Sequence, residues 1–219
     1  MKYIIMCGGT YHKWETMRQL TKIHGETLIE RTMRLLQFWG VDKHDIAVSV
    51  SNAEQARAII KSGNHPSILV HRNPFEVLPG NKCVGYWCDC FCVRFEPCTY
   101  LMGDVVFSTK AIETIVKTQT DDIEFFASAP PFSKQYSKEW AEPFAFKVVN
   151  QEHLREAIET TKQLCNEGKF KRHPISWEFW QVVKDTPINV IDYTNYTAIN
   201  DYTCDIDTPE DINKFEGAE

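Results

Sequence analysis

The sequence predicts an α/β fold of three layers, in which helices cover both faces of a mixed, mostly parallel sheet. Short apolar runs rich in β-branched residues alternate with longer segments whose apolar residues recur at helical spacing. This alternation is typical of βαβ units, which place their strands in parallel. The chain has 219 residues, of which 43% are hydrophobic, and this is sufficient for one large domain spanning residues 1–219.

An apolar strand opens the chain and leads into a loop that holds two glycines. Residues 2–7 are too few for a typical helix and are followed by Gly8 and Gly9. Glycines after a strand allow positive φ and let the backbone approach a ligand closely. Four basic side chains follow: Lys13, Arg18, Lys22 and His24. We therefore expect this loop to bind an anion, and the alternative is an ordinary connection with a solvated basic face.

Strands and helices alternate from residue 28 to residue 70. Apolar side chains recur at helical spacing after Leu28 and end at Gly40, which suits a helix C-cap. Residues 46–50 and 67–70 predict strands. The segment between them predicts a helix, capped by Asn52 or by the residue before it.

Residues 72–93 predict a loop and then a buried helix. The first part, residues 72–82, holds two prolines, two asparagines and one glycine, a composition typical of a loop. Residues 84–93 are most simply a buried helix. Five cysteines lie in or beside it: Cys83, Cys88, Cys90, Cys92 and Cys98. Their spacing lacks the paired ligands of a structural zinc site. We therefore expect small buried side chains in a reducing compartment, with metal or redox chemistry as the alternative.

The second half of the chain continues the pattern. Residues 99–103 predict a strand that ends at Asp104, the position at which a parallel α/β sheet places a functional carboxylate. Residues 128–142 are rich in proline and aromatic side chains, and an insertion of this length is more often functional than structural. The remaining elements are predicted as helices over 108–117, after Asn150 and around 177–180, and as strands over 123–127, 144–149 and 188–191.

The end of the chain contains the pattern of a helix start. Thr208 suits the N-cap, Pro209 the first helical position, and Asp211 completes a capping-box arrangement. Asp207 then lies just outside the helix, two residues after Asp205. The alternative is that these two aspartates merely flank a helix start.

Composition argues against several classes of function. The net charge is −6, with 24 basic and 30 acidic residues, which argues against a nucleic-acid-binding protein with a broad basic surface. No apolar run approaches the roughly 20 residues needed to span a bilayer. The N-terminus enters a strand directly and lacks the pattern of a secretory signal. We therefore expect a cytoplasmic protein with no membrane or nucleic-acid partner.

Two aspartates are candidate ligands for a metal ion. Asp104 and Asp207 are far apart in the sequence, and each lies at the edge of a predicted α/β element. Magnesium is held by one or two carboxylates together with substrate phosphates and waters. Beside a glycine loop with several cations, these two residues would suffice for such a site.

Four motifs, taken together, resemble one family. They are IIMCGG, QLTKIHGETLIERTMRLL, YLMGDVVFS and DIDTPEDI, and they extend from residue 4 to residue 212. In this order and spacing they resemble the nucleotidyltransferases of the MobA-like and sugar-phosphate type, which include the cytidylyltransferases acting on phosphocholine. The resemblance implies a Rossmann-like, GT-A-type fold and Mg²⁺ as cofactor. It also implies that a phosphorylated acceptor attacks the α-phosphorus of a nucleoside triphosphate and that pyrophosphate leaves.

The resemblance implies roles for individual residues as well. Lys13 takes the place of the loop arginine, and Arg18 falls where the lysine of a proline–lysine pair is expected. Asp104 and Asp207 would hold the magnesium, with Asp205 as the alternative second ligand. The implied nucleotide-binding residues are Met6, Cys7, Gly8, Gly9, Thr10, Asn81 and Lys82. The last two belong to a Gly-Asn-Lys loop that mildly favours CTP.

The acceptor is defined less closely by the sequence. An insertion around residues 128–185 would bind it, with Trp177 and Trp180 as contacts and Lys147 or Arg172 on its phosphate. A cage for a quaternary ammonium such as phosphocholine would use several aromatic faces, and this region is dense in aromatic side chains. Core packing and a sugar-stacking wall are the alternatives. A homodimer is left open as the assembly.

Two other functions are weighed against this one. Tyr11, Lys13 and the Met17-Arg18 pair depart from the family pattern, and these departures favour a non-catalytic nucleotide-binding or regulatory homologue on the same scaffold. A GT-A glycosyltransferase would place a second aspartate two residues after Asp104, where this chain has Val106. The sequence therefore favours the nucleotidyltransferase.

Overall fold

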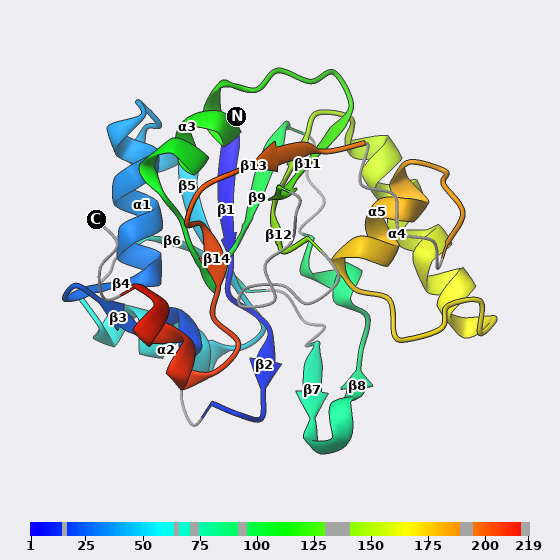
Figure 1. Ribbon diagram of the computed structural model, residues 1–219, viewed down its shortest axis with the longest axis horizontal. Coiled ribbons are helices and arrows are strands. Elements are labelled where there is room, and N and C mark those ends of the chain that lie inside the picture. The colour runs from blue at the N-terminus through cyan, green and yellow to red at the C-terminus, as the bar shows by residue number, and fades with distance from the viewer. Residues whose placement is uncertain are drawn as a thin grey trace.

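The computed structural model describes residues 1–14, 17–63, 66–70, 75–91, 96–129, 141–188 and 195–215. Seven strands form the central sheet in the order β13-β11-β12-β9-β1-β5-β6 (Figure 1). In that order they span Thr197–Ile199, Ile123–Ser128, Pro143–Val148, Cys98–Met102, Lys2–Met6, Ile46–Val50 and Ser67–Val70. β12 runs antiparallel to both of its neighbours, and the other neighbouring strands are parallel. The predicted mixed, mostly parallel sheet is therefore confirmed.

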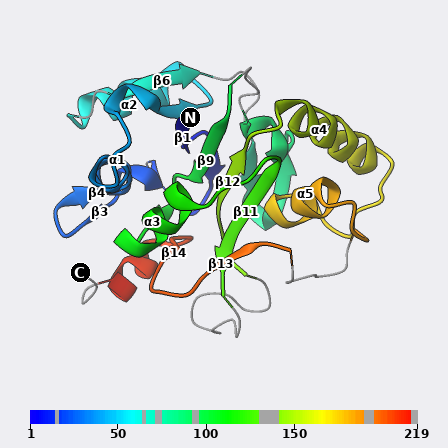
Figure 2. The same cartoon turned by 90° about the horizontal axis from the view of Figure 1, so that it is seen from above.

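Helices cover both faces of this sheet. The α-helices of the described segments are α1 (Leu28–Phe38), α2 (Ala53–Lys61), α3 (Thr109–Lys117), α4 (Gln151–Asn166) and α5 (Ser176–Val183). α1, α2 and α3 lie on one face, and α4 and α5 lie on the other (Figure 2). The three predicted layers are thus present. In the part of the chain that is described, no helix has the length and apolar character needed to cross a membrane.

Side-chain caps set where the helices begin. Thr27 Oγ1 accepts a hydrogen bond from the N–H of Glu30, whose carboxylate accepts one from the N–H of Thr27, so α1 starts in a capping box. Asn52, Ser108 and Asn150 cap α2, α3 and α4 through their side-chain oxygens. Because these caps are local, the sequence predicts the starts of α2, α3 and α4.

Shorter elements connect the main ones. Three 3₁₀ helices cover Arg18–Leu20, Lys43–Asp45 and Pro79–Asn81. β3 (Lys22–Ile23) pairs with β4 (Glu26–Thr27) in a tight turn before α1.

The described part of the segment 84–93, residues 84–91, does not form the predicted helix. β8 (Lys82–Val84) pairs with β7 (Glu76–Leu78), which in turn pairs with β2 (Thr10–Tyr11). Gly85 then adopts φ of +78°, and a 3₁₀ helix covers Trp87–Cys90. A residue in the left-handed region interrupts a right-handed helix, so the apolar run is divided at this glycine.

Two further predictions concern the C-terminal third of the chain. The strand predicted over 188–191 lies largely outside the described residues, and the strand that pairs with β11 is β13. Pro209–Phe215 forms a 3₁₀ helix instead of an α-helix. A segment of seven residues gains little from α-helix propagation, so its tertiary contacts decide its geometry. The buried Phe215 ring is one such contact.

Aromatic side chains fill the core between the sheet and α5. Phe125 and Phe146, on the neighbouring strands β11 and β12, stack with their ring centroids 4.5 Å apart. Trp177 and Trp180 of α5 pack on Phe125 at centroid distances of 5.1 and 5.2 Å, and they are only 3% and 2% exposed. These tryptophans stabilise the fold by removing a large apolar surface from water.

Lys147 is a buried cation in the middle of β12. Its Nζ donates to the carbonyls of Val116 and Thr118 at 3.1 and 2.6 Å. These carbonyls lie at the C-terminal end of α3, where a cation also complements the helix dipole. Burial lowers the pKa of Lys147 to about 8. Lys147 therefore caps α3, and the predicted contact with an acceptor phosphate does not fit this position.

Replacing Lys147 with methionine is expected to change how stability depends on pH. The unfolded chain keeps the ordinary lysine pKa of 10.5, whereas the folded value is about 8, so the unfolded state binds more protons between these values. Relative to Lys147→Met, the wild-type protein should gain about 2 kcal/mol of unfolding free energy between about pH 7 and about pH 9.5. Urea unfolding at the two pH values measures this difference.

The exposed Lys110 of α3 provides the matched control. Lys110→Met should follow the wild-type pH profile. A stability difference between wild type and Lys147→Met that stays constant over the range would contradict the role assigned to this side chain.

Candidate functional site

A cavity of about 650 Å³ lies at the carboxyl ends of β1 and β9. Its walls come from the glycine loop, the β7–β8 hairpin, the α4–α5 connection and the segment before the C-terminal 3₁₀ helix. Parallel α/β sheets bind their ligands at this edge. Seven of the predicted catalytic and nucleotide-binding residues line the cavity: Met6, Gly8, Gly9, Thr10, Arg18, Asp104 and Asp207. The alternative ligand Asp205 and the predicted acceptor contact Arg172 line it as well.

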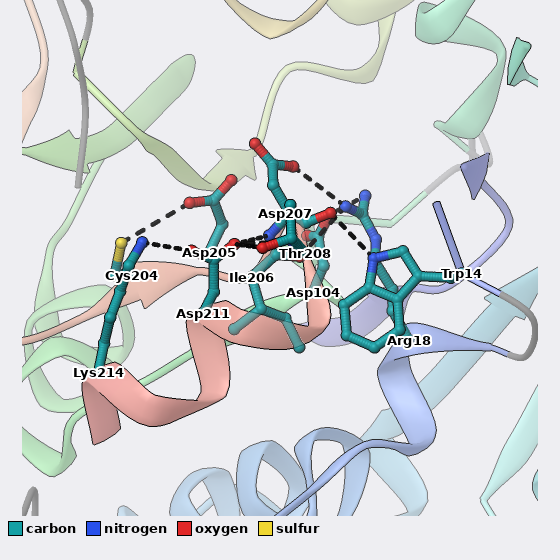
Figure 3. A network of polar contacts seen from close by, with 10 residues as sticks. All are labelled: Trp14, Arg18, Asp104, Cys204, Asp205, Ile206, Asp207, Thr208, Asp211 and Lys214. Atoms are coloured by element: carbon teal, nitrogen blue, oxygen red, sulfur yellow. Dashed lines mark hydrogen bonds and ion pairs between the residues drawn. The ribbon is translucent and has the colours of Figure 1, made fainter. Parts of the chain in front are cut away.

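Arg18 connects the two predicted metal ligands. Its guanidinium forms an ion pair with Asp104 and a second one with Asp207, whose Oδ1 lies 3.3 Å from Nη1 (Figure 3). The same Nη1 donates to the carbonyl of Ile206 at 3.3 Å. The side chains of Arg18 and Asp104 are 19% and 20% exposed, whereas that of Asp207 is 63% exposed. The predicted phosphate-binding cation and the predicted metal ligands therefore form one cluster.

Backbone pairing brings these distant segments together. The N–H of Gly103 donates to the carbonyl of Met6 at 3.0 Å, and a Cβ on Gly103 would lie 2.4 Å from that oxygen, so a side chain does not fit here. Immediately beyond, β10 (Val105–Val106) pairs antiparallel with β14 (Cys204–Asp205). The N–H of Ile206, the residue after β14, donates to the carbonyl of Asp104 at 3.0 Å. The start of the closing motif is thus held beside the end of β9.

Asp211 fixes the backbone of the closing motif. Its Oδ2 accepts from the N–H groups of Asp207 and Thr208 at 2.9 and 2.7 Å and from the Thr208 hydroxyl at 3.1 Å. Lys214 Nζ lies 2.6 Å from Asp211 Oδ1. Trp14 Nε1 donates to the carbonyl of Asp207 at 3.0 Å, which connects the glycine loop to this motif. The backbone of Asp207 is therefore held on two sides while its carboxylate points outward (Figure 3).

The cluster carries an excess of negative charge. Burial raises the pKa of Asp205 well above its usual range, and the charges of Glu142, Asp207 and Asp104 raise it further. Burial acts to lower the pKa of Arg18, but the three aspartates together raise it above its ordinary value, so the guanidinium stays charged. Arg18 thus pairs with Asp104 and Asp207, and the carboxyl group of Asp205 lies near the same guanidinium. Such a cluster favours binding of a further cation.

The glycine loop presents exposed backbone to the cavity. Ser51 Oγ donates to the carbonyl of Gly8 at 2.5 Å, and Thr10 begins the short strand that pairs with β7. Gly9 is exposed, and a Cβ there would meet nothing within 4 Å. Neither Gly8 nor Gly9 adopts positive φ. A ligand can therefore approach the backbone at Gly9 as expected. Neither glycine, however, is needed here for a positive φ angle.

Other predicted nucleotide-site residues do not line the cavity described here. Cys7 is fully buried behind the loop, and its burial raises the pKa of its thiol. Lys13 is exposed, with Nζ 5.1 Å from the centroid of the Tyr11 ring. Lys82 is exposed on β8, and the side chain of Asn81 lies outside the described atoms. Their contacts with a nucleotide stay predictions.

Of the predicted acceptor-binding residues, Arg172 lines the cavity, whereas Lys147, Trp177 and Trp180 are in the interior of the protein. Trp177 Nε1 donates to the carbonyl of Ala141 at 2.7 Å, and Trp180 packs in the aromatic core. Lys147 caps α3. The same apolar pattern predicts a binding wall and a core helix face, and in this fold α5 turns that face inward.

The clustered cysteines divide into two groups. Cys88 and Cys98 are buried as predicted, and burial raises the pKa of the Cys88 thiol to about 12. Cys83 and Cys90 are half-buried and line the cavity. Cys92 lies outside the described residues.

Several side chains that line the cavity are absent from the sequence-based prediction. They are Gln19, Phe75, Trp87, His173 and Ser176. Trp87 belongs to the segment predicted as a helix, and Phe75 to the segment predicted as a loop. His173 follows Arg172 in the α4–α5 connection. The basic pair Arg172-His173, just before the helix predicted around residues 177–180, is the one local signal in the sequence for this side of the cavity.

Comparisons with known proteins find similarity in structure but not in sequence. The sequence matches no protein-family model. No curated protein matches it either.

Three solved structures with a similar fold have names that refer to nucleotides. A nucleoside-diphosphate-sugar pyrophosphorylase from Vibrio cholerae has a TM-score of 0.57 at 12% identity, over 98% of this chain and 99% of that one. The molybdopterin-guanine dinucleotide biosynthesis protein A of Archaeoglobus fulgidus has a TM-score of 0.54 at 12% identity, over 99% of this chain and 97% of that one. The CTP:phosphocholine cytidylyltransferase of Streptococcus pneumoniae has a TM-score of 0.51 at 13% identity, over 98% of this chain and 97% of that one. At these identities the comparison confirms the Rossmann-like α/β fold class.

Replacing Asp205 with asparagine is expected to stabilise the free protein near neutral pH. Because the folded pKa of Asp205 is raised, its charged form costs stability above that pKa, and the cost vanishes below the unfolded pKa. The gain in unfolding free energy should be larger at about pH 7.5 than at about pH 4 and should shrink as the pH falls. Urea unfolding across this range measures it.

Asp211→Asn is a matched control of opposite sign. Burial acts to raise the pKa of Asp211, but the Lys214 ammonium and the Thr208 N–H lower it below its ordinary value. Its charge therefore contributes stability above the unfolded pKa, and the contribution is lost on acidification. Asp211→Asn should destabilise the protein at neutral pH. Changes of the same sign in both variants would be incompatible with the charge distribution described above.

Proposed function

We propose that this protein is a magnesium-dependent nucleotidyltransferase, which joins a nucleoside triphosphate to a phosphorylated small-molecule acceptor and releases pyrophosphate. The observation that carries the proposal is the meeting of the glycine loop, Arg18, Asp104 and Asp207 at one cavity. The similar fold of proteins named for reactions of nucleotides supports it. CTP is the favoured triphosphate, from the resemblance of the Gly-Asn-Lys loop at residues 80–82.

The proposed reaction depends on alignment more than on acid–base catalysis. A phosphate monoester has a second pKa of about 6, so it is mostly ionised near neutral pH and can attack without a general base. A bond forms between its oxygen and the α-phosphorus while the bond from that phosphorus to pyrophosphate breaks. Two anions must therefore be held together, and the charge on the leaving group must be stabilised. The exposed backbone of the glycine loop and the guanidinium of Arg18 suit these tasks.

Asp104 and Asp207 fit the requirements of a magnesium ion. Mg²⁺ prefers carboxylate oxygens and takes its other ligands from substrate phosphates and water. Two carboxylates pair with one guanidinium here and a third, Asp205, lies near it, so a divalent cation would reduce the excess of negative charge. Asp205 is the alternative second ligand. When bound, the ion would supply charge neutralisation for the triphosphate.

Arg18 and such a cation would interact with the same carboxylates. In the free protein the guanidinium pairs with Asp104 and Asp207. Occupation of those oxygens by a cation would release the guanidinium toward the phosphates of a bound nucleotide in the same cavity. An arginine suits this task because its planar donors bind two phosphate oxygens at once. Arg18 would thus keep the site neutralised when empty and bind phosphate when loaded.

A non-catalytic nucleotide-binding homologue is the second candidate. The ion pairs of Arg18 favour it, because they already neutralise two of the carboxylates that a metal would need. Nucleotide binding without turnover, unaffected by the loss of Asp207, would support this candidate. A GT-A glycosyltransferase is less favoured, because β10 places Val106 where such enzymes carry a second aspartate.

Pyrophosphate release provides the test of the proposed function. With Mg²⁺, each of the four triphosphates and a panel of phosphorylated acceptors, the wild-type protein should release pyrophosphate, most rapidly with CTP. Asp104→Asn should reduce the rate by about a hundredfold or more, because the variant loses a carboxylate that would hold the metal ion at the triphosphate.

Asp121→Asn is the matched control, since Asp121 is exposed in the α3–β11 connection. It should retain wild-type activity. Silence of the folded wild-type protein with every pair of substrates would refute the transfer reaction, and full activity of Asp104→Asn would remove this residue from the mechanism.

A further inference from the structure

The α4–α5 connection forms a wall of the cavity that the proposed transfer chemistry does not use. Arg172, His173, Ile175 and Ser176 all line the cavity. They belong to the segment 128–185 that the sequence predicts as acceptor-binding. Their chemistry therefore bears on which acceptor the cavity would take.

His173 is held in a fixed orientation. Its ring stacks on Phe75 with centroids 5.6 Å apart and planes inclined by 24°, and the Tyr86 ring lies 6.5 Å away at 28°. The carbonyl of Gly85 takes part in a hydrogen bond with the ring. Tyr86 is itself fixed, because its hydroxyl donates to Asn166 Oδ1 at 2.5 Å. The imidazole therefore has little freedom to turn.

Among the described residues, the second ring nitrogen of His173 has no hydrogen-bond partner. Nε2 is buried, and no group of the described residues bonds to it. Because a carbonyl only accepts, the nitrogen that faces Gly85 carries the proton in the neutral ring, and Nε2 keeps its lone pair as an acceptor. Burial lowers the pKa of His173, which favours this neutral form. A buried acceptor without a partner is unfavourable, so a donor from a ligand would stabilise it.

Arg172 fixes a positive charge on the same wall. Its Nε and Nη2 lie 2.5 and 3.3 Å from the two carboxylate oxygens of Glu178, whose side chain is 5% exposed. Glu178 Oε2 also accepts from the N–H of Ile175 at 3.1 Å. Glu178 therefore holds the guanidinium in place, while the side chain of Arg172 remains 44% exposed. This wall thus combines a held cation with a hydrogen-bond acceptor.

We propose that the Arg172–His173 wall selects the acceptor of the transfer reaction, and that this acceptor is a phosphate ester that carries a hydroxyl group, as polyol and sugar phosphates do. His173 Nε2 accepts a hydrogen bond from that hydroxyl, and Arg172 attracts the anion. The assignment rests on the proposed function. Phosphocholine is disfavoured because its quaternary ammonium has no N–H or O–H to donate. A site built to bond a hydroxyl discriminates strongly against an analogue that lacks it.

Equilibrium titration of the free wild-type protein tests the wall without requiring turnover. The probes are glycerol 3-phosphate, glucose 1-phosphate and inositol 1-phosphate, with propyl phosphate and phosphocholine as analogues that lack the hydroxyl. At least one hydroxyl-bearing phosphate should bind about tenfold more tightly than both analogues. Equal affinity for glycerol 3-phosphate and propyl phosphate with no preference among the others, tighter binding of phosphocholine, or binding of none would overturn the proposal.

Variants of the wall provide the second arm of the test. His173→Phe keeps an aromatic ring between Phe75 and Tyr86 but removes the acceptor, so the preference for hydroxyl-bearing phosphates should be lost. His173→Gln restores an acceptor oxygen and should recover part of it. His44→Phe, at an exposed histidine of the 3₁₀ helix Lys43–Asp45 outside the cavity lining, should change the affinities by less than about twofold. If His173→Phe does not fold, the comparison of ligands on the wild-type protein decides the matter.

Turnover separates this proposal from the function on which it rests. Hydroxyl-dependent binding without pyrophosphate release from any triphosphate would refute the transfer reaction while leaving a hydroxyl-selective phosphate site. Pyrophosphate release that is equally efficient in wild type and His173→Phe, with unchanged KM for the acceptor, would refute the wall while leaving the transfer reaction.

Discussion

The ion pairs of Arg18 with Asp104 and Asp207 are the interaction on which the site depends, because they join three segments from distant parts of the chain. Asp104 is delivered by the buried strand β9, and Asp207 by a closing motif that Asp211 and Trp14 hold in place. The pairing of β10 with β14 sets their separation. None of these segments forms the site alone, and the order of the central sheet brings them together at one edge.

Charge explains why this arrangement suits a ligand better than it suits the free protein. Two carboxylates pair with one guanidinium, and burial keeps the nearby Asp205 in an environment that is unfavourable for its charged form. A fold under selection for stability alone would replace such a group with a neutral side chain. A bound cation and a polyanionic nucleotide, in contrast, would each find complementary groups in the same cavity. Charge imbalance at a concave site is a common feature of catalytic and binding centres.

Much of the fold follows from local sequence patterns, and the site follows only in part. β1, β5, β6 and β9 and the caps of α2, α3 and α4 depend on periodicity and neighbouring residues, so the sequence predicts them. Asp104 is predicted because it ends a strand. The partners of Lys147, by contrast, are carbonyls of a helix 30 residues away, and Gly85 divides an apolar run that would otherwise suit a helix. His173 meets Phe75 only through tertiary contact.

Direct measurement of divalent-cation binding tests most sharply whether Arg18 and a metal ion share the same two carboxylates. Mn²⁺, followed by electron paramagnetic resonance, can be titrated into wild type, Asp104→Asn, Asp207→Asn and Arg18→Met, with and without CTP. Loss of either aspartate should weaken Mn²⁺ binding in the presence of CTP by about tenfold or more, which corresponds to about 1.4 kcal/mol. Without nucleotide, Arg18→Met should bind Mn²⁺ more tightly than wild type. Mn²⁺ affinity that is indifferent to both aspartates, or that falls in Arg18→Met without nucleotide, would contradict this account.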